Sequence, residues 1–189
     1  EEFLGYEIGQ QFSRHADVVN YFEQVAKNSP LVQYHTYGKT NERRPLTYAV
    51  ISSEENLRNL EEIRKKHLGN TGISETDGEA DKAIVWLSYN VHGNEASSTE
   101  AAMKTLYALI TEKQDWLENT VVIIDPCVNP DGRDRYANWY NQVKAEPYNP
   151  LQVAAEHHEP WPGGRPNHYL FDLNRDWFIL SQPESRARV

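Results

Sequence analysis

The sequence predicts an α/β protein built on a mixed, largely parallel central sheet with helices on both faces. Residues 84–87 and 121–124 are almost entirely apolar, which is typical of strands buried on both faces. Residues 98–111 lie between these runs and place apolar side chains at helical spacing. A strand, a helix and a strand in this order indicate an α/β domain. At 189 residues the chain has the size of one domain, so we expect a single unit over residues 1–189.

The segments before the first apolar run alternate between helix and strand. A helix is expected at 16–28, where apolar side chains recur at helical intervals. Two strands are expected at 31–38 and 46–52, joined by a polar turn. A second helix is expected at 54–68, because Ser53 can cap its start and basic residues lie near its end.

The remaining segments comprise two loops, a further strand and the start of a helix. The stretch 69–82 and the proline-rich stretch 141–168 are expected to be loops. Residues 169–173 are expected to form a strand. Ser181 and Glu184 have the spacing of a capping box, which predicts a helix start. Because so short a helix cannot support itself, we expect the chain to be the N-terminal portion of a longer domain.

Composition and charge exclude several classes of protein. The 19 basic and 28 acidic side chains give a net charge of −9, which disfavours nucleic acid as the main partner. No apolar run approaches the ~20 residues that cross a bilayer, so no transmembrane segment is predicted. The single cysteine, Cys127, excludes an internal disulfide, and we expect it to be buried rather than to act as a nucleophile.

Polar and charged side chains follow each of three expected strands. These stretches are 89–95, 125–135 and 174–176. Ligand sites in open α/β sheets collect at the carboxyl ends of the strands. Three such ends together therefore predict one shared site.

His92 and Glu95 are the strongest candidates in this site. An imidazole nitrogen and a carboxylate oxygen suit Zn²⁺, and a catalytic zinc commonly takes two histidines and a glutamate, with one position left for water. Both residues lie between a strand end and a helix start, so they can converge on one point. The alternative is a surface histidine beside a glutamate that favours the helix dipole. Ser97 and Glu100 are expected to form a capping box at that helix start.

Two further motifs allow both a structural and a functional interpretation. The stretch 129–132, Asn-Pro-Asp-Gly, is a turn sequence. Asn174 and Arg175 place an amide beside a guanidinium, which suits a bound carboxylate. The alternative is a surface salt bridge from Arg175 to Asp172 or Asp176.

Together, these motifs resemble the zinc carboxypeptidases related to carboxypeptidase A. The matching residues are His92-Gly93-Asn94-Glu95, Asn129-Pro130-Asp131-Gly132 and Asp172-Leu173-Asn174-Arg175. An upstream stretch, 37–46, resembles the family's early hairpin, so that the resemblance covers most of the chain. It implies a carboxypeptidase-like fold, one zinc ion held by His92 and Glu95, and hydrolysis of a C-terminal peptide bond.

The resemblance also implies how a peptide substrate with a free C-terminal carboxylate is held. Asn174 and Arg175 match the pair that binds this carboxylate. A further arginine of the family polarises the scissile carbonyl. Arg165 is the first candidate for this role, and Arg135 and Arg133 are the alternatives.

The sequence departs from the family pattern after Arg175. The family's third zinc ligand, a histidine, and its general-base glutamate lie beyond that motif. Here no histidine follows Arg175, and the only glutamate there is Glu184. The other histidines weighed as a third ligand are His157, His158 and His168. We therefore expect the third ligand beyond Val189, and weak or no zinc binding and no turnover for these 189 residues.

Two other functions fit the same motifs. One is a non-catalytic module that binds carboxylates or peptides through Asn174 and Arg175. The other is an amidase that acts on a cell-wall or other non-protein amide, because the motifs specify the metal and the carboxylate but not the neighbouring side chain. The resemblance to commonly exported relatives predicts a secreted or periplasmic location.

Overall fold

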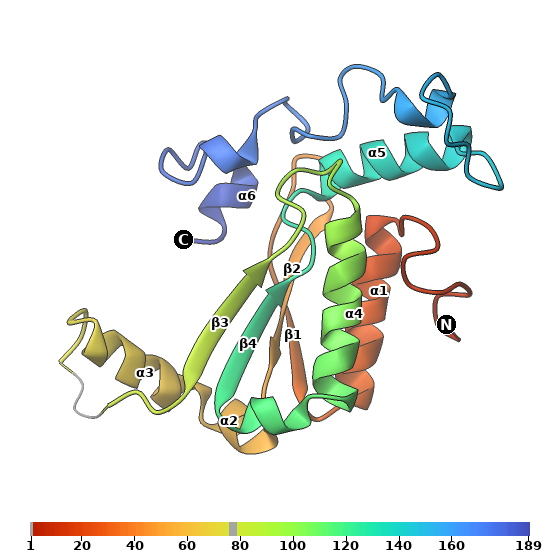
Figure 1. The fold of residues 1–189 in the computed structure, drawn as a ribbon. Coiled ribbons are helices and arrows are strands. Elements are labelled where there is room, and N and C mark those ends of the chain that lie inside the picture. The colour runs from red at the N-terminus through yellow and green to blue at the C-terminus, as the bar shows by residue number, and fades with distance from the viewer. Residues whose placement is uncertain (1, 76–78) are drawn as a thin grey trace.

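The computed structural model describes residues 2–75 and 79–189, and within them a four-stranded sheet is packed with helices (Figure 1). The strands are β1 Val32–Lys39, β2 Pro45–Ile51, β3 Ala83–Ser88 and β4 Thr120–Asp125. The α-helices are α1 His15–Asn28, α2 Glu54–Arg58, α3 Leu60–Asn70, α4 Ser97–Thr111, α5 Pro130–Val143 and α6 Pro183–Arg186. The 3₁₀ turns are η1 Gln114–Glu118, η2 Ala155–His157 and η3 Leu173–Arg175.

The sheet is mixed, with the strand order β1-β2-β4-β3. The pairs β1–β2 and β2–β4 are antiparallel, and β3–β4 is parallel. The predicted mixed α/β class is confirmed. The expectation that parallel pairs predominate does not hold for the described strands, because β1 and β2 form a hairpin and the short turn between them reverses the chain.

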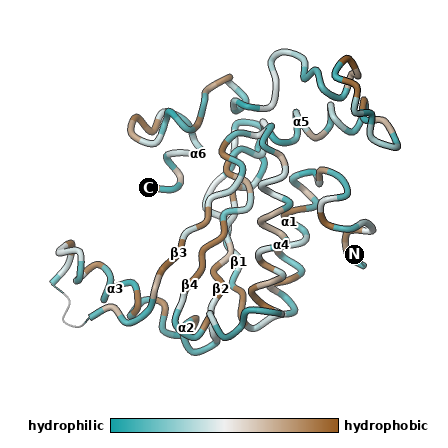
Figure 2. The backbone as a smooth tube through the Cα atoms, in the orientation of Figure 1, coloured by the Kyte–Doolittle hydropathy of each residue, from teal (hydrophilic) through white to brown (hydrophobic). Residues whose placement is uncertain are grey.

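Helices α1 and α4 lie side by side over one face of the sheet (Figure 1). Phe22 of α1 and Leu106 of α4 are fully buried against Ile51 of β2 and Ile124 of β4. Figure 2 shows runs of hydrophobic residues along β3 and β4. Each fully buried side chain of this size contributes roughly 1.5–3 kcal/mol. This layer is therefore the main core, and it fixes the ends of β3 and β4, from which the candidate site extends.

The opposite face of the sheet is partly covered by α2 and α3. Leu57 of α2 and Ile63 of α3 pack against Val50 of β2 and Val121 of β4. The prediction of helices on both faces is confirmed.

The helix predicted at 54–68 is two helices. Ser53 caps α2 as expected, accepting a hydrogen bond from the backbone N of Asn56 at 3.2 Å. The break falls at Asn59, whose φ of −106° and ψ of 16° are not helical. Asparagine competes for backbone hydrogen bonds and is a weak helix former, which allows the chain to turn there.

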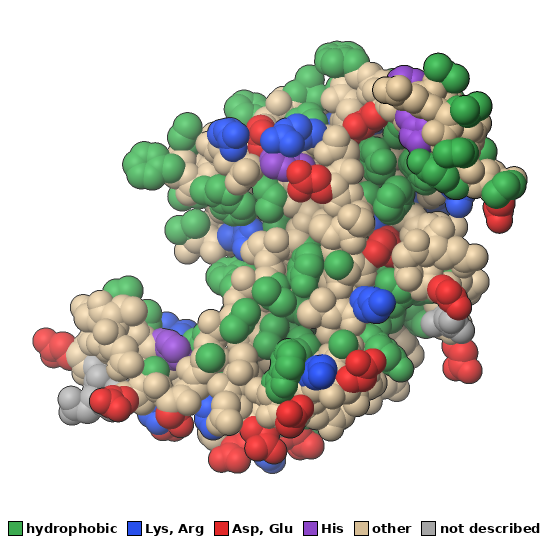
Figure 3. Space-filling view, in the orientation of Figure 1, with side chains coloured by type: hydrophobic (Ala, Val, Ile, Leu, Met, Phe, Trp, Pro, Cys, Tyr) green, Lys and Arg blue, Asp and Glu red, His purple; other side chains and the backbone are tan. Residues whose placement is uncertain are grey.

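Strand β3 is more exposed than its apolar sequence predicts. Ile84, Val85 and Trp86 are 39%, 40% and 51% exposed. Among the described strands β3 pairs only with β4, so one of its edges is open. Figure 3 shows hydrophobic side chains on the hollowed side of the molecule between α3 and α6. An apolar run predicts a strand, but it does not predict what covers that strand.

The strand predicted at 169–173 is absent from the described structure. The Asn167 carboxamide oxygen accepts hydrogen bonds from the backbone N atoms of Tyr169 and Phe171, both at 3.1 Å. Leu170 between them has a φ of 65°. The segment is therefore a turn closed by an asparagine side chain, and this competes with pairing in a sheet.

Helix α5 was not predicted, because its first residues were interpreted as a turn. Asn129 caps this helix, and its Oδ1 accepts from the backbone N of Gly132 at 2.9 Å. Pro130 lies in the first turn, where its missing N–H costs nothing. After α5, residues 144–182 contain only η2 and η3 among irregular segments.

Neither predicted capping box forms. Helix α4 begins after Ala96 without a side-chain cap, and Glu100 instead accepts hydrogen bonds from Ser13. Helix α6 begins at Pro183 after Gln182, while the Ser181 hydroxyl donates to Asp176 at 2.6 Å. In both cases a tertiary or loop partner competes for the capping side chain.

Candidate metal and carboxylate site

Three chain segments meet above the carboxyl ends of β3 and β4: the loop after β3, the start of α5, and residues 163–175 (Figure 1). Glycines make this contact possible. A Cβ atom on Gly93 would lie closer than 3.0 Å to backbone atoms of Gly132 and Gly164. The Arg165 carbonyl accepts from the backbone N of Gly93 at 3.4 Å and from Asn129 Nδ2 at 3.1 Å. The shared site predicted from the strand ends therefore has a close-packed backbone base.

Asn90 shapes the loop that carries His92 and Glu95. It follows β3 with a φ of 56°, a conformation that asparagine tolerates better than most residues. Its Nδ2 donates to the carbonyl oxygens of His92 at 2.7 Å and Glu95 at 3.1 Å. The Cys127 thiol donates to Asn90 Oδ1 at 3.4 Å. Sequence reasoning did not single out Asn90, although an asparagine directly after a strand is a turn signal.

Cys127 is buried, as predicted. Burial raises the pKa of its thiol to about 12. The thiolate is therefore not accessible near neutral pH, and Cys127 is a structural residue.

His92 is buried and lies between two carboxylates. Its Nδ1 is 3.0 Å from Glu95 Oε1, and its Nε2 is 3.0 Å from Asp172 Oδ1. Ionised carboxylates only accept hydrogen bonds, and a neutral imidazole has a single N–H. When Nε2 donates to Asp172, the lone pair of Nδ1 faces Glu95, and a cation or a second proton is needed between them.

Zinc fits this pair of atoms. Two ligands of a tetrahedral zinc ion, at the usual Zn–N and Zn–O lengths, lie about 3.3 Å apart. The 3.0 Å between His92 Nδ1 and Glu95 Oε1 is close to this spacing. Glu95 has a side chain that is 61% exposed, so the position is open to solvent.

Asp172 orients His92, and sequence reasoning did not predict this role of Asp172. Besides His92 it accepts from the backbone N of Asn174 at 2.9 Å and from Arg165 Nη2 at 3.1 Å. Desolvation opposes the charge, but these hydrogen bonds outweigh it and lower the pKa of Asp172. A carboxylate on the second nitrogen of a metal-binding histidine fixes its tautomer and raises its basicity. The signal in the sequence was an acid two residues before Asn174.

The predicted substrate-binding residues lie beside Asp172. Asn174 Oδ1 accepts from Trp177 Nε1 at 3.1 Å, and Arg175 Nη1 donates to the Asn174 carbonyl at 3.1 Å. Both residues are exposed. Within the described part of the chain, Arg175 forms no salt bridge with Asp172 or Asp176. Asp176 is instead buried and accepts from the loop 181–182.

The three candidate arginines have different surroundings. Arg165 forms a salt bridge with Asp172, and 47% of its side chain is exposed. Arg135 donates to the carbonyls of Gly163 and Asn167, and so supports the loop before Asp172. Arg133 is fully buried in a salt bridge with Glu100. Of the three, only Arg165 presents a guanidinium at the site.

No further ligand joins His92 and Glu95 among the described residues. Over residues 2–75 and 79–189, a group of three potential metal ligands occurs only at Glu42, Asp131 and His168. Arg44 forms salt bridges with both acids of that group, which reduces its attraction for a cation. The other two histidines weighed as ligands, His157 and His158, lie in and next to η2.

Glu184, the only glutamate after Arg175, is not at this site. It is buried, and its Oε2 accepts from Asn167 Nδ2 at 3.4 Å. Burial raises the pKa of its carboxyl. Glu184 therefore belongs to the packing of α6.

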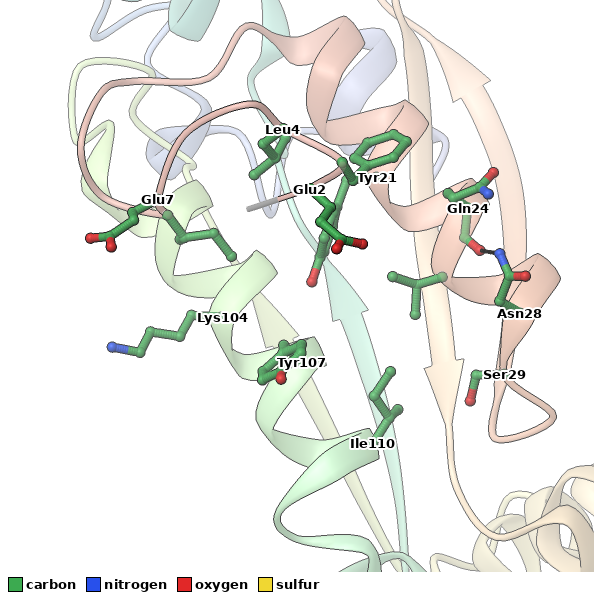
Figure 4. Close-up of a pocket in the computed structure, with 13 residues that line it drawn as sticks. Glu2, Leu4, Glu7, Tyr21, Gln24, Asn28, Ser29, Lys104, Tyr107 and Ile110 are labelled. Atoms are coloured by element: carbon green, nitrogen blue, oxygen red, sulfur yellow. Dashed lines mark hydrogen bonds between the residues drawn. The ribbon is translucent and has the colours of Figure 1, made fainter.

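A cavity of about 770 Å³ lies elsewhere, between the N-terminal segment, α1 and α4 (Figure 4). Its walls include Leu4, Tyr21, Tyr107 and Ile110. No candidate site residue lines it. This cavity therefore carries none of the chemistry above.

The profile of the zinc carboxypeptidase family matches residues 18–187. The chain therefore belongs to the zinc carboxypeptidase family, whose members are metal-dependent hydrolases. A search of curated proteins finds no match. None of the described helices is long and apolar enough to cross a membrane.

Solved carboxypeptidases share the fold. Bovine thrombin-activatable fibrinolysis inhibitor, solved with a tick carboxypeptidase inhibitor, matches with a TM-score of 0.56 and 15% identity over 100% of this chain and 56% of its own. Carboxypeptidase A from Helicoverpa armigera matches with a TM-score of 0.56 and 19% identity, over 94% of this chain and 41% of its own. A putative carboxypeptidase A from Shewanella denitrificans matches with a TM-score of 0.57 and 17% identity, over 96% of this chain and 36% of its own. The chain thus spans between 36% and 56% of these solved chains.

Proposed function

We propose that this chain carries part of the active site of a zinc-dependent enzyme that hydrolyses the C-terminal peptide bond of a peptide or protein. One observation carries the proposal: His92 is fixed by Asp172 on one nitrogen and faces Glu95 with the other, at 3.0 Å. Family membership supports zinc as the ion. Frequent export within the family supports a secreted or periplasmic location.

His92 and Glu95 would hold the ion, and Asp172 would keep the His92 ring in the tautomer that leaves Nδ1 unprotonated. A bound zinc ion supplies Lewis acidity toward a carbonyl and activates water near neutral pH. Arg165 would stabilise the negative charge that develops on the scissile carbonyl oxygen. Its Nη2 contacts Asp172, and its other donors have no protein partner in the described structure.

Asn174 and Arg175 would select the end of a peptide. Arg175 is exposed and lacks a carboxylate partner in the described part of the chain. A guanidinium pairs in bidentate fashion with a free C-terminal carboxylate, whereas an internal peptide bond offers no charge. This difference favours removal of terminal residues over internal cleavage.

Binding of two matched peptides tests the carboxylate role directly. The peptides share one sequence, and one carries a free C-terminal carboxylate while the other carries an amide. We expect the acid to bind at least tenfold more tightly to the 189-residue chain, as measured by calorimetry. Arg175→Ala should remove this difference. Arg58→Ala, an exposed change on α2 at the other end of the sheet, should keep it. Equal affinities for both peptides on the unaltered chain would refute the proposal.

We expect these 189 residues to bind such peptides without hydrolysing them. Two protein ligands hold zinc weakly, and among the described residues no third ligand joins His92 and Glu95. A longer chain that adds a third ligand and a general base should release the C-terminal amino acid. A non-catalytic binding module would show the same peptide preference and no release in any length of chain.

A further inference from the structure

A second polar site lies at the carboxyl ends of β3 and β4, on the face of the sheet opposite α1 and α4. Asp125 is the last residue of β4 and is completely buried. Its Oδ2 accepts from the Tyr37 hydroxyl at 2.8 Å, and its Oδ1 has no hydrogen-bond partner. Burial raises the pKa of Asp125 to about 6, although the charge of Arg188 and the Tyr37 hydrogen bond lower it. An ionised carboxylate at this depth requires a cation beside it.

The cation in this site is the guanidinium of Arg188. Its Nε lies 3.6 Å from Asp125 Oδ2, and its Nη2 donates to the Ser88 hydroxyl at 2.6 Å. Its central carbon lies 5.0 Å from the ring centroid of Trp86 and 5.1 Å from that of Trp177. A carboxylate, a hydroxyl and two indole rings thus surround one planar cation, and groups of these kinds bind a guanidinium.

The site is larger than its present occupant. A cavity of about 330 Å³ adjoins the guanidinium, lined by Tyr37, Tyr48, Trp86 and Ile123 of the sheet together with Ala187 and Arg188. Arg188 Nη1 is buried without a partner, just as Asp125 Oδ1 is. Arg188 therefore supplies the positive charge beside Asp125. It leaves its own Nη1, the Asp125 Oδ1 atom and the adjoining cavity without a partner.

We propose that this is a guanidinium-binding site in which Arg188 is the resident ligand, and that an external guanidinium group, such as an arginine side chain, occupies it when Arg188 is absent. The site is distinct from the zinc and carboxylate site. The two are neighbours, because Trp177 packs on Arg188 and also donates to Asn174. Neither proposal depends on the other.

Chemical rescue of an Arg188→Ala variant tests the proposal, with methylguanidinium as the probe. The variant removes the resident cation and leaves Asp125 buried without one. We expect its melting temperature to fall and to be restored by methylguanidinium in a saturable manner at millimolar concentration. Methylammonium and sodium at equal ionic strength should not restore it, because they lack the planar fork. Arg186→Ala, an exposed neighbour in α6, should show neither the loss nor the rescue.

Two comparisons of affinity for methylguanidinium test whether the probe binds in the place of Arg188 and beside Asp125. The unaltered chain should bind the probe at least tenfold more weakly than Arg188→Ala, because Arg188 occupies the site. The double variant Asp125→Asn/Arg188→Ala should also bind at least tenfold more weakly. Equal affinity in the unaltered chain and Arg188→Ala, or in the single and double variants, would overturn the proposal. Should Arg188→Ala fail to fold, Arg188→Gln, which keeps a long polar side chain but removes the cation, takes its place, and absence of saturable binding to that variant overturns the proposal in the same way.

Discussion

The chemistry of the site depends on how His92 divides its two nitrogens between Asp172 and Glu95. In the tautomer that carries its proton on Nε2, His92 donates to Asp172, whose charge is stabilised by Arg165 and the backbone N of Asn174. The lone pair of Nδ1 is then left for an ion shared with Glu95. A carboxylate at Nε2 increases the electron density at Nδ1, so Asp172 would strengthen His92 as a metal ligand without itself contacting the ion.

Replacing Asp172 with Asn tests this role at the level of one residue. The amide keeps the size of the side chain but loses the charge that supports His92. We expect zinc affinity, measured by competition with a chromogenic chelator, to fall roughly 10- to 100-fold. Asp115→Asn, an exposed change in η1, is the matched control and should leave zinc affinity unchanged. An unchanged affinity in Asp172→Asn would show that Asp172 is only a structural partner of the loop.

Spacing in the sequence predicted some site residues but not others. His92 and Glu95 are three residues apart in one loop, so a local pattern was enough to propose them as a pair. Asp172 lies 80 residues from His92, and its own neighbours suggested a salt bridge with Arg175. Its role follows only from the packing of three segments. Arg165 was already the first candidate from the sequence, and the structure adds that Arg135 donates to backbone carbonyls.

At the scale of elements, the site depends on close backbone contacts between the loop after β3, the first turn of α5 and the loop around Gly164. Gly93 and Gly132 belong to the two motifs that first indicated the site. Their contacts with Gly164 leave no room for a Cβ atom. These glycines therefore allow the backbone segments to approach closely, and this places His92 and Glu95 over the strand ends.

Gly93→Ala should separate these segments. Its methyl group would collide with backbone atoms, which cannot move as a flexible side chain can. We expect a loss of about 3 kcal/mol in the free energy of unfolding, measured with urea. Gly72→Ala is the control, because that glycine has a φ of 73° and open space around its Cβ position. Its cost should be about 1 kcal/mol from backbone strain alone. Equal losses in the two variants would contradict the close packing.

Local patterns predicted elements well where packing agrees with them. Helices α1 and α4 lie where apolar periodicity predicted helices, and β4 lies at the apolar run 121–124, because all three pack into one core. Helix α5 was missed because Asn129 and Pro130 suit both a turn and a helix start. The segment 169–173 was wrongly predicted as a strand, because the capping side chain of Asn167 cannot be recognised from alternation of residues.

At the scale of the whole molecule, the chain combines one half-covered sheet with a site at the ends of its strands. Helices α1 and α4 pack over one face of the sheet, while β3 leaves Ile84, Val85 and Trp86 exposed. The chain spans 56% of the solved bovine fibrinolysis inhibitor and a smaller share of the two solved carboxypeptidases. Within the described residues, the proposed site comprises two candidate zinc ligands, His92 and Glu95, the carboxylate of Asp172, and the candidate carboxylate-binding pair Asn174 and Arg175.

Anomalous diffraction at the zinc absorption edge, from crystals soaked in zinc, tests the central claim most directly. We predict a peak between His92 Nδ1 and the Glu95 carboxylate, and its loss in Glu95→Gln crystals. A peak at Glu42, Asp131 and His168 instead, or no peak beside His92 at saturating zinc, would contradict the account.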